Sequence, residues 1–525
     1  MDWSFPYPSQ RMPVMADCMV ASSQPLAVQA GVDCMRRGGN AVDAAITTAI
    51  TLTVVEPTSN GLGSDAFAMV FHDGKLHGIN GSGRSPRSWR YDQFAAFESM
   101  PQLGWLSVTV PGAVSVWMAL SERFGSLPFA QLFAAAIAYA QDGYAVSPIT
   151  AQAWHKAGER FQDCAEFKRV YMPHGQAPEV GQRMRNPDQA DSLRRIAESA
   201  GQAFYQGELA ARMLRAANSA GVAWDVADLS EHQSEWVAPL AINYYGYDVY
   251  ELPPNGQGMA ALIALALLQR LDIASLAPDS VQSLHLQIEA MKIGFQAVEQ
   301  HLADPAWMPV EAQVLLLPEV IERHAKQIDR KKAQAIPFRL ATDHGTVYLS
   351  TADASGNMVS LIQSNYMGFG SGVVIPESGI AMQNRGAGFS LKRGHPNQVD
   401  GGKRPFHTII PGFVCKDGQP VLSFGVMGGR MQPQGHVQML VRILGAGQNP
   451  QAASDAPRWC VLEDGSVALE ATIPQATVAA LRALGHPITI ETNSALFGGA
   501  QLIMKQASGY IGASDHRKDG LAAGF

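Results

Sequence analysis

Apolar side chains recur at helical spacing over much of the first two thirds of the chain. Residues 24–55 carry two such stretches, separated by Gly38-Gly39, and Asn40 is placed to cap the second stretch, which stops before Pro57. We therefore expect two consecutive helices there. Helix-period apolar residues also occur in five later segments, namely 112–123, 128–142, 190–218, 257–271 and 278–302.

Alternating apolar runs joined by short turn sequences predict a series of β-hairpins. The first consists of AFAMVF and KLHGI joined by Asp73-Gly74, and a second runs from Thr346 through a turn at 355–357 to Ser364. Tight hairpins form antiparallel sheets, and the long helices must bury their apolar faces against them, so we expect a layered architecture with sheets between helices. Three further hairpins have their turns at Asp417-Gly418, Asp464-Gly465 and Ser508-Gly509.

One segment separates the mainly helical part from the later hairpins. Residues 329–345 are charged and then irregular, with the sequence RKKAQAIPFRLATDHG after Asp329, and they end immediately before Thr346. We interpret this segment as a linker. Neither an internal repeat nor a low-complexity tract is present in the chain.

The composition is that of a globular protein without a basic surplus. Of the 525 residues, 47% are hydrophobic and 16% are charged, which is enough apolar surface for a large core. The net charge of −7 argues against nucleic acid or an anionic membrane as a partner, because no excess of basic side chains is available to neutralise phosphates. No secretory signal is evident, and the longest apolar run, 41–55, is too short and too polar to span a bilayer. We expect a cytoplasmic protein.

Motifs for common metal and cofactor sites are missing. The five cysteines are widely spaced, and the 14 histidines form no H-E-x-x-H motif, so we expect neither a disulfide framework nor a metal site. The G-x-S-x-G elbow of serine hydrolases is also missing. Gly256-Gln257-Gly258 lacks the third glycine of a dinucleotide loop, and the glycines at 368–372 precede no P-loop lysine. We therefore expect no cofactor.

Nine segments spread from residue 38 to residue 520 resemble the gamma-glutamyltranspeptidase family. Together they are specific, because they are long and stand in the family's order. The segments are GGNAVDAA (38–45), EPTSNGLGSDAF (56–67), VPGAV (110–114), GYDVYELPPNGQG (246–258), TVYLSTADASGN (346–357), FGSGVVIPESGI (369–380), GKRP (402–405), MGGR (427–430) and GASDHRKDG (512–520).

The resemblance implies a proenzyme that cuts itself between Gly345 and Thr346. Cleavage would give a large, helix-rich chain of residues 1–345 and a small, catalytic chain of residues 346–525. The two would remain one intertwined heterodimer, which could dimerise further. The implied fold is α+β, a four-layer αββα sandwich of the N-terminal-nucleophile hydrolases with antiparallel sheets.

The resemblance also implies a mechanism in which Thr346 is the nucleophile. A threonine hydroxyl needs a base, and a freed α-amine, with a reference pKa of about 7.7–8.0, is partly neutral near pH 7. The hydroxyl would attack an amide carbonyl and form an acyl-Thr346 ester. In the family a second hydroxyl and two glycine N–H groups assist, and these match Ser364, Gly428 and Gly429.

The chain departs from the family where the gamma-glutamyl group binds. Ser82 stands where the family has the arginine that holds the substrate α-carboxylate, and Arg84 lies two residues further on. Two serines that also bind this carboxylate are replaced by His407 and Thr408.

The groups that hold the substrate ammonium are replaced as well. Gly388 and Arg385 stand where the family has an aspartate and a neighbouring amide side chain, and Tyr366 replaces an acidic or amide residue just past Ser364. A cation thus takes the place of an anion. The departures favour a small substrate with a carboxylate near the scissile amide and no ammonium group, and a guanidinium suits a carboxylate through bidentate pairing.

With these substitutions, the chain resembles the branch of the family that includes oxamate amidohydrolase, an enzyme of purine (ureide) nitrogen recovery. The leading hypothesis is therefore an amidohydrolase that converts a small carboxylate-bearing amide, with oxamate as the best single guess, to the acid and ammonia. Three alternatives stay open: a gamma-glutamyltranspeptidase or glutathione hydrolase, an acylase of the same family, and a non-catalytic family member.

Overall fold

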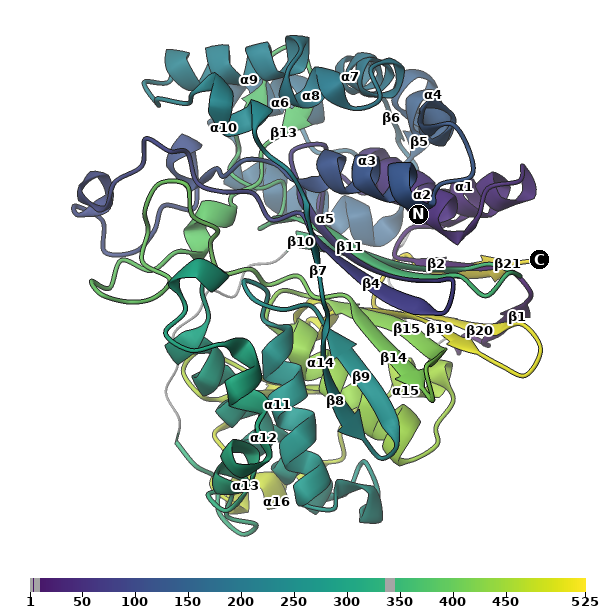
Figure 1. Ribbon diagram of the computed structural model, residues 1–525, viewed down its shortest axis with the longest axis vertical. Helices are drawn as coiled ribbons and strands as arrows, with labels where there is room; N and C mark the ends of the chain where they lie inside the picture. The colour runs from purple at the N-terminus through teal and green to yellow at the C-terminus, as the bar shows by residue number, and fades with distance from the viewer. Residues whose placement is uncertain (1–2, 4–9, 336–344) are drawn as a thin grey trace.

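The computed structural model describes residue 3, residues 10–335 and residues 345–525. Most of the predicted linker, residues 336–344, therefore lies outside the described residues. Within the described part, two seven-stranded antiparallel sheets pack face to face, and helices cover the outer face of each (Figure 1). The expected α+β fold, a four-layer αββα sandwich, is confirmed.

The first sheet carries the two hairpins predicted around residues 73 and 355. In the turn of the earlier hairpin, Asp73 and Gly74 have φ values of 47° and 72°, the left-handed pair that a tight hairpin turn requires. The strand order is β21 (Leu521–Gly524), β2 (Met19–Ser22), β10 (Gly345–Ala352), β11 (Met358–Tyr366), β3 (Asp65–His72), β4 (Lys75–Asn80) and β7 (Glu235–Val237).

The second sheet contains the hairpins predicted around residues 417 and 508. Strands from before and after residue 345 contribute to both sheets, so neither part of the chain can form a sandwich by itself. The strand order is β1 (Val14–Ala16), β20 (Tyr510–Ser514), β19 (Gly499–Lys505), β15 (Gln419–Met427), β14 (Gly412–Lys416), β9 (Tyr247–Glu251) and β8 (Leu240–Tyr244).

The helices above the first sheet include the predicted pair α1 (Pro25–Arg36) and α2 (Ala41–Val55). Asn40 caps α2 with a complete capping box, as expected, and every residue of α2 is buried. The segment predicted as one helix over 190–218 is three, because Gly201, at φ 91°, and Gly207 interrupt it. This layer comprises α3 (Ala113–Phe124), α4 (Ala134–Asp142), α5 (Pro148–Arg160), α6 (Ala165–Tyr171), α7 (Pro187–Glu198), α8 (Gln202–Tyr205), α9 (Glu208–Ser219) and α10 (Val226–Ser230).

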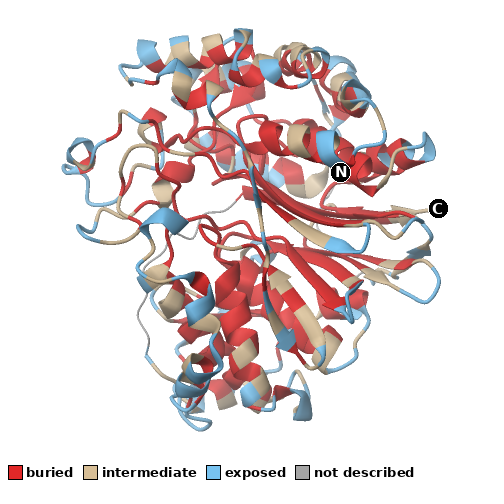
Figure 2. Cartoon of the chain, viewed as in Figure 1, coloured by how far each residue is buried: buried red, intermediate tan, exposed pale blue. Residues whose placement is uncertain are grey.

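The helices over the second sheet are led by α11 and α12, which match the segments predicted at 257–271 and 278–302. Both lie deep in the lower half of the molecule, where most of their residues are buried (Figure 2). No helix in the described ranges is long and apolar enough to cross a membrane. This layer consists of α11 (Gly258–Arg270), α12 (Val281–His301), α13 (Pro318–Ala325), α14 (Met431–Leu440), α15 (Pro450–Asp455) and α16 (Gln475–Ala483).

Short strands complete the structure outside the two large sheets. The hairpin predicted around residue 464 forms β16 (Trp459–Val461) and β17 (Val467–Glu470), which β18 (Ile488–Glu491) extends in parallel. Two further pairs are β5 (Tyr144–Ala145) with β6 (Arg183–Met184) and β12 (Val374–Ile375) with β13 (Ile380–Ala381).

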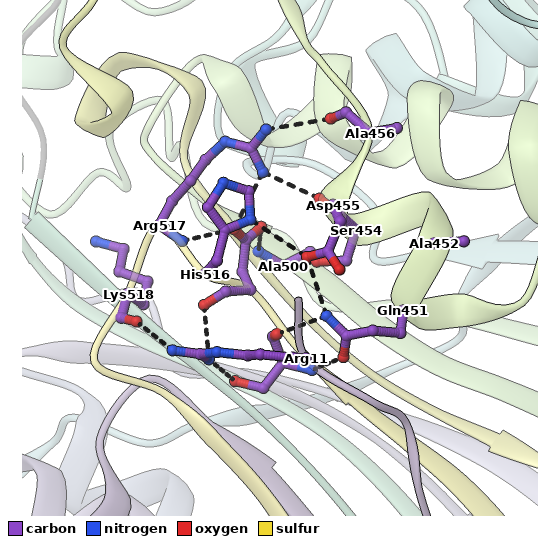
Figure 3. A network of polar contacts seen from close by, with 12 residues as sticks. Arg11, Gln451, Ala452, Ser454, Asp455, Ala456, Ala500, His516, Arg517 and Lys518 are labelled. Carbon is purple, nitrogen blue, oxygen red and sulfur yellow. Dashed lines mark hydrogen bonds and ion pairs between the residues drawn. The ribbon is translucent and has the colours of Figure 1, made fainter. Parts of the chain in front are cut away.

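A buried network of charged side chains holds the loop around residues 515–520 in place. Asp515, within the family-like segment 512–520, accepts from Arg458 Nη2 at 2.5 Å and Arg517 Nη1 at 3.1 Å, and these guanidiniums hold its pKa well below the usual range. Arg11 donates to the main-chain oxygens of Lys518 and Gly520, at 3.2 Å and 2.9 Å (Figure 3). The beginning of the described chain is therefore fastened to its end.

Four hydroxyl groups join the two sheets in the middle of the sandwich. The Tyr348 hydroxyl lies 2.8 Å from Ser350 Oγ and 2.7 Å from Ser360 Oγ, and Ser350 Oγ lies 2.9 Å from Ser423 Oγ on the other sheet. All four residues are fully buried, and burial raises the pKa of Tyr348 to about 12. β10 starts at the Gly345–Thr346 junction, and β15 leads into the segment 428–430. The cluster therefore links the strand that carries Thr346 to the strand that leads to Gly428 and Gly429.

We predict that Tyr348→Phe lowers the free energy of unfolding by about 1–3 kcal/mol, because it removes the group shared by the serine hydroxyls. Tyr244→Phe is the matched control. Tyr244 is also fully buried, but its hydroxyl has no hydrogen-bond partner among the described residues, so its loss should be neutral or stabilising. Urea denaturation of both variants measures the difference, and equal losses would contradict this role for the cluster.

Candidate active site

Thr346 lies at the start of an inner strand, in a β-bulge. The pairing of β10 with β11 shifts register between Gly345 and Val347, and such bulges re-aim side chains. Ser364 faces Thr346 from β11, and Asp65 is the pairing partner of Ser364 on β3. Three neighbouring strands thus bring Thr346, Ser364 and Asp65 side by side at one end of the first sheet.

The Ser364 hydroxyl is the centre of the hydrogen bonds at this end. It donates to the carbonyl oxygen of Gly345 at 2.6 Å. It accepts from Thr346 Oγ1 at 3.2 Å, from the Tyr366 main-chain N–H at 2.8 Å and from Arg385 Nη2 at 3.0 Å. Its proton therefore polarises the carbonyl of the peptide bond that joins Gly345 to Thr346, while its oxygen holds the threonine hydroxyl.

Arg385 brings a buried positive charge next to this pair. Its Nη1 donates to Thr408 Oγ1 at 2.8 Å, and its guanidinium stacks 4.3 Å from the centre of the Tyr366 ring. The side chain is fully buried, and burial lowers the pKa of Arg385 to about 10, so it stays charged at neutral pH. Arg385 and Thr346 are both bonded to Ser364 Oγ, so the guanidinium charge is close enough to lower the pKa of a free α-amine on Thr346 and to favour its neutral form.

Gly388 has a steric reason to be glycine. A Cβ atom there would lie 2.5 Å from the carbonyl oxygen of Phe406, closer than any real contact allows. No carboxylate side chain therefore fits this position in the present backbone, in keeping with the loss of the family's aspartate.

His407 is buried and neutral. Its Nδ1 accepts from the Ile409 N–H at 3.3 Å, so its Nε2 carries the proton and donates to Asp65 Oδ2 at 3.0 Å. Burial and the nearby Arg385 guanidinium lower the pKa of His407 well below its usual value. His407 therefore acts as a hydrogen-bond donor to Asp65.

Asp65 is fully enclosed by its partners. Besides His407, it receives the main-chain N–H groups of Gly83 at 3.3 Å and Gly112 at 3.0 Å on Oδ1. Burial raises the pKa of Asp65 to about 7, and the Arg385 charge opposes this shift. Its carboxyl oxygens are thus occupied within the fold.

Gly428 and Gly429 form a turn that only glycine adopts easily. Their φ values are 115° and 58°, and a Cβ on Gly428 would lie 3.0 Å from the Gly498 Cα. Neither N–H donates to another group in the part of the chain that the structure describes. Gln257 Nε2 donates to the carbonyls of Gly429 and Thr408, at 2.7 Å and 2.6 Å, which places this turn beside Arg385 and its partners.

The structure separates the other two predicted site residues. Ser82 is buried, and its hydroxyl accepts from Asn255 Nδ2 at 2.8 Å. Arg84 lies elsewhere: its side chain is 43% exposed, and it pairs with Asp304 at 2.8 Å and Glu235 at 3.4 Å. The structure therefore brings Thr346, Ser364, Arg385, Tyr366 and Thr408 into one hydrogen-bonded group. His407 lies beside this group, bonded to Asp65, the strand-pairing partner of Ser364, and Arg84 does not belong to it.

Sequence reasoning assigned no role to Asp65, Gln257 or Arg430, although all three lie within the family-like segments. Their position inside SDAF, NGQG and MGGR was the available signal. The sequence offers Gln257 only as part of an incomplete dinucleotide loop, because the contacts that give it a role come from residues more than a hundred positions away.

One group of side chains in the described ranges has donor atoms close enough for a metal ion. His285, Glu289 and His486 place one atom each within 4.8 Å of the others. Lys292 Nζ donates to Glu289 Oε1 at 2.8 Å, so the lysine side chain already neutralises the Glu289 carboxylate. The sequence had suggested no such cluster, because the two histidines are 201 residues apart.

Comparisons with known proteins agree over the whole chain. The family model described as gamma-glutamyltranspeptidase matches residues 27–525. The oxamate amidohydrolase proenzyme of Klebsiella pneumoniae is 34% identical over 97% of this chain and 98% of its own, and the glutathione hydrolase-like YwrD proenzyme of Bacillus subtilis is 35% identical over the same shares. The crystal structure of cephalosporin acylase from Bacillus halodurans has a TM-score of 0.95 and 45% identity, covering 100% of this chain and 99% of that one.

The raised pKa of Asp65 predicts a pH-dependent contribution to stability. The folded protein binds the Asp65 proton more tightly than the unfolded chain, whose reference pKa is about 3.9. This contribution is therefore present at low pH and is lost as the pH rises from about 4 to about 7. Asp65→Asn cannot ionise, so its unfolding free energy should rise relative to wild type over that interval.

Denaturant titrations at pH 4, 5.5 and 7 test this. Asp92→Asn, at an exposed carboxylate, should follow the wild-type profile. If the difference between Asp65→Asn and wild type stays constant with pH, the carboxyl ionises at its ordinary pKa.

Proposed function

The chain belongs to the gamma-glutamyltranspeptidase family of hydrolase proenzymes, and we propose that it cuts itself and then hydrolyses amides with Thr346 as its nucleophile. The observation that carries this proposal is the Thr346–Ser364–Gly345 arrangement. A hydroxyl nucleophile, a polarised carbonyl and the peptide bond to be broken all lie within one buried group.

In the proposed self-cleavage, Thr346 Oγ1 attacks the carbonyl carbon of Gly345. The developing oxyanion is stabilised by the Ser364 hydroxyl, which already donates to this oxygen. The Oγ1 proton passes to the Thr346 nitrogen as collapse breaks the Gly345–Thr346 C–N bond, which frees the α-amine and leaves the Gly345 carbonyl as an ester on Thr346 Oγ1. Water then hydrolyses this ester. The products are residues 1–345 and 346–525, and their interleaved strands in both sheets would keep them together.

In the proposed catalytic cycle, the freed α-amine of Thr346 is the base. Before cleavage this nitrogen is an amide and cannot accept a proton. Afterwards it takes the Oγ1 proton, Oγ1 attacks the substrate carbonyl, and the N–H groups of Gly428 and Gly429 receive the oxyanion. The amine then returns the proton to the leaving nitrogen, and water hydrolyses the acyl-Thr346 ester.

For the substrate we propose a small amide that carries a carboxylate. Arg385 places a cation beside Thr346, whereas the Asp65 carboxylate is occupied by His407 and two main-chain N–H groups. Such a site favours an anion over an ammonium group. Oxamate is the first candidate, supported by the similarity to an oxamate amidohydrolase proenzyme, and would place the enzyme in purine (ureide) nitrogen recovery.

A second candidate is an acylase that removes the acyl chain of a cephalosporin. The 45% identity to the cephalosporin acylase of Bacillus halodurans favours it. Both candidates share the acyl-Thr346 chemistry and differ in the acyl group and in the leaving nitrogen compound, which is ammonia for oxamate and the cephalosporin amine for the acylase.

We predict that Thr346→Ala stays a single chain of 56.3 kDa and that Ser364→Ala cuts about 100-fold more slowly than wild type. A time course on denaturing gels measures both, and N-terminal sequencing of the small chain should begin at Thr346. Ser192→Ala, a fully buried serine on α7, is the control and should cut normally. An uncut wild type would support a non-catalytic family member, and cutting of Thr346→Ala would exclude this nucleophile.

We predict that the processed enzyme has its highest kcat/KM on carboxylate-bearing amides. The panel is oxamate, glutamine, glutathione, simple amides and a cephalosporin amide, followed by ammonia or amine release. Turnover of glutathione or glutamine without oxamate would instead identify a gamma-glutamyl hydrolase or transferase. A preference for the cephalosporin amide would identify an acylase.

A further inference from the structure

Arg430 is buried beside the candidate active site with unused hydrogen-bond donors. It follows Gly428-Gly429 directly, and only 7% of the residue is exposed. Neither Nη1 nor Nη2 has a hydrogen-bond partner among the residues that the structure describes. Buried guanidinium groups are normally paired, because an unpaired buried charge is unfavourable, so these two donors point to a ligand.

Two aromatic rings and two carboxylates surround the Arg430 side chain. Its guanidinium lies 5.3 Å from the ring centres of Phe295, on α12, and of Phe406. Burial lowers the pKa of Arg430 to about 9, so it is still a cation at neutral pH. Glu299 and Glu463 attract it electrostatically without hydrogen-bonding to either Nη atom.

Two features of the fold connect Arg430 to the proposed nucleophile. The Phe406 ring beside its guanidinium lies two residues before Thr408, which accepts from Arg385, and Arg385 also donates to Ser364. Gln257 holds the carbonyl of Gly429, the residue before Arg430. Arg430 directly follows the two glycines whose N–H groups are the proposed oxyanion donors. A group that Arg430 binds is therefore held by the same short segment of chain.

The two arginines that the sequence predicts at the site are already engaged. Arg385 uses Nη1 and Nη2 for Thr408 and Ser364, and Arg84 pairs with Asp304 and Glu235. Arg430 alone among these three has both terminal nitrogens unpaired within the described chain. Two parallel N–H donors in one plane match the two oxygens of a carboxylate.

We propose that Arg430 binds the carboxylate of the substrate's acyl group, so that the substrates are monoamides of short dicarboxylic acids. This inference rests on the proposed amide hydrolysis and specifies its substrate class. In this assignment the scissile carbonyl would lie at Thr346 and the Gly428-Gly429 turn, and the carboxylate of the acyl group would pair with the Arg430 guanidinium. Arg385 then keeps Ser364 and the base in place and is not the carboxylate anchor.

Paired substrates test the assignment in the processed enzyme. The pairs are oxamate with oxamide and succinamate with succinamide, which differ only in one carboxylate. Arg430→Met should lower kcat/KM for the carboxylates by at least about 30-fold and change the neutral diamides by less than about threefold. Arg430→Lys, which keeps the charge but not the two-donor fork, should fall between.

Arg442→Met is the matched control. Arg442 is also buried, at 5% exposure, but it pairs with Asp279, so its loss should leave the ratio between carboxylate and diamide unchanged. Gels showing complete cutting establish that each variant is folded and processed. If Arg430→Met does not mature, the same comparison is made with Arg430→Lys.

Calorimetric titration with oxalate and succinate separates this inference from the proposed function. Binding by wild type that Arg430→Met loses supports the carboxylate site, even if no monoamide is hydrolysed and the proposed substrate class fails. Hydrolysis of monoamides with an unchanged preference in Arg430→Met overturns the role of Arg430 and leaves the proposed function standing. Absence of dicarboxylate binding to wild type also overturns it.

Discussion

The Ser364 hydroxyl has one proton and two lone pairs, and the candidate active site depends on how they are shared. Its proton is directed to the Gly345 carbonyl, so only the lone pairs remain for three donors. The Tyr366 N–H and Arg385 hold it at 2.8 Å and 3.0 Å, whereas Thr346 Oγ1 is the most distant at 3.2 Å. Of the three hydrogen bonds that Ser364 Oγ accepts, the one from the threonine hydroxyl is the longest. This hydroxyl is therefore the least tightly held of the three donors.

These hydrogen bonds require a rigid backbone at Thr346 and Ser364, and the packing of the two sheets provides it. Thr346 begins β10, an inner strand with neighbours on both sides, and the hydroxyl cluster around Tyr348 links it to Ser423 of the other sheet. The strand that carries Ser423 ends at Met427, directly before Gly428. Thr346 and the glycine turn therefore belong to different sheets, but the strands that lead to them are cross-linked by this cluster.

Local signals made the fold predictable, and distant contacts decided the site. Asn40 and Asp73-Gly74 determine a helix start and a hairpin through their own backbone, so a pattern in the sequence reveals them. The break of the helical pattern at Gly201 was missed, because one glycine does not by itself end a helix. The position of Arg84 could not be predicted, because it is decided by Asp304 and Glu235, both more than 150 residues away.

The balance of charge in the site explains why two arginines can be buried there. Arg385 is charged, Arg430 is charged, and the neighbouring Asp65 carboxyl is only partly ionised near pH 7. The Asp65 carboxyl offsets the charge of Arg385, and Glu299 and Glu463 offset that of Arg430, but none of them hydrogen-bonds to the terminal nitrogens of Arg430. Under the proposed function, a substrate carboxylate would make that direct pairing and so favour anionic over neutral or cationic amides. A gamma-glutamyl group carries both an α-carboxylate and an ammonium group, so its net charge would not by itself exclude it from this site. What would disfavour it is the lack of an anionic partner for the ammonium group, because the Asp65 carboxyl is already occupied by His407 and two main-chain N–H groups.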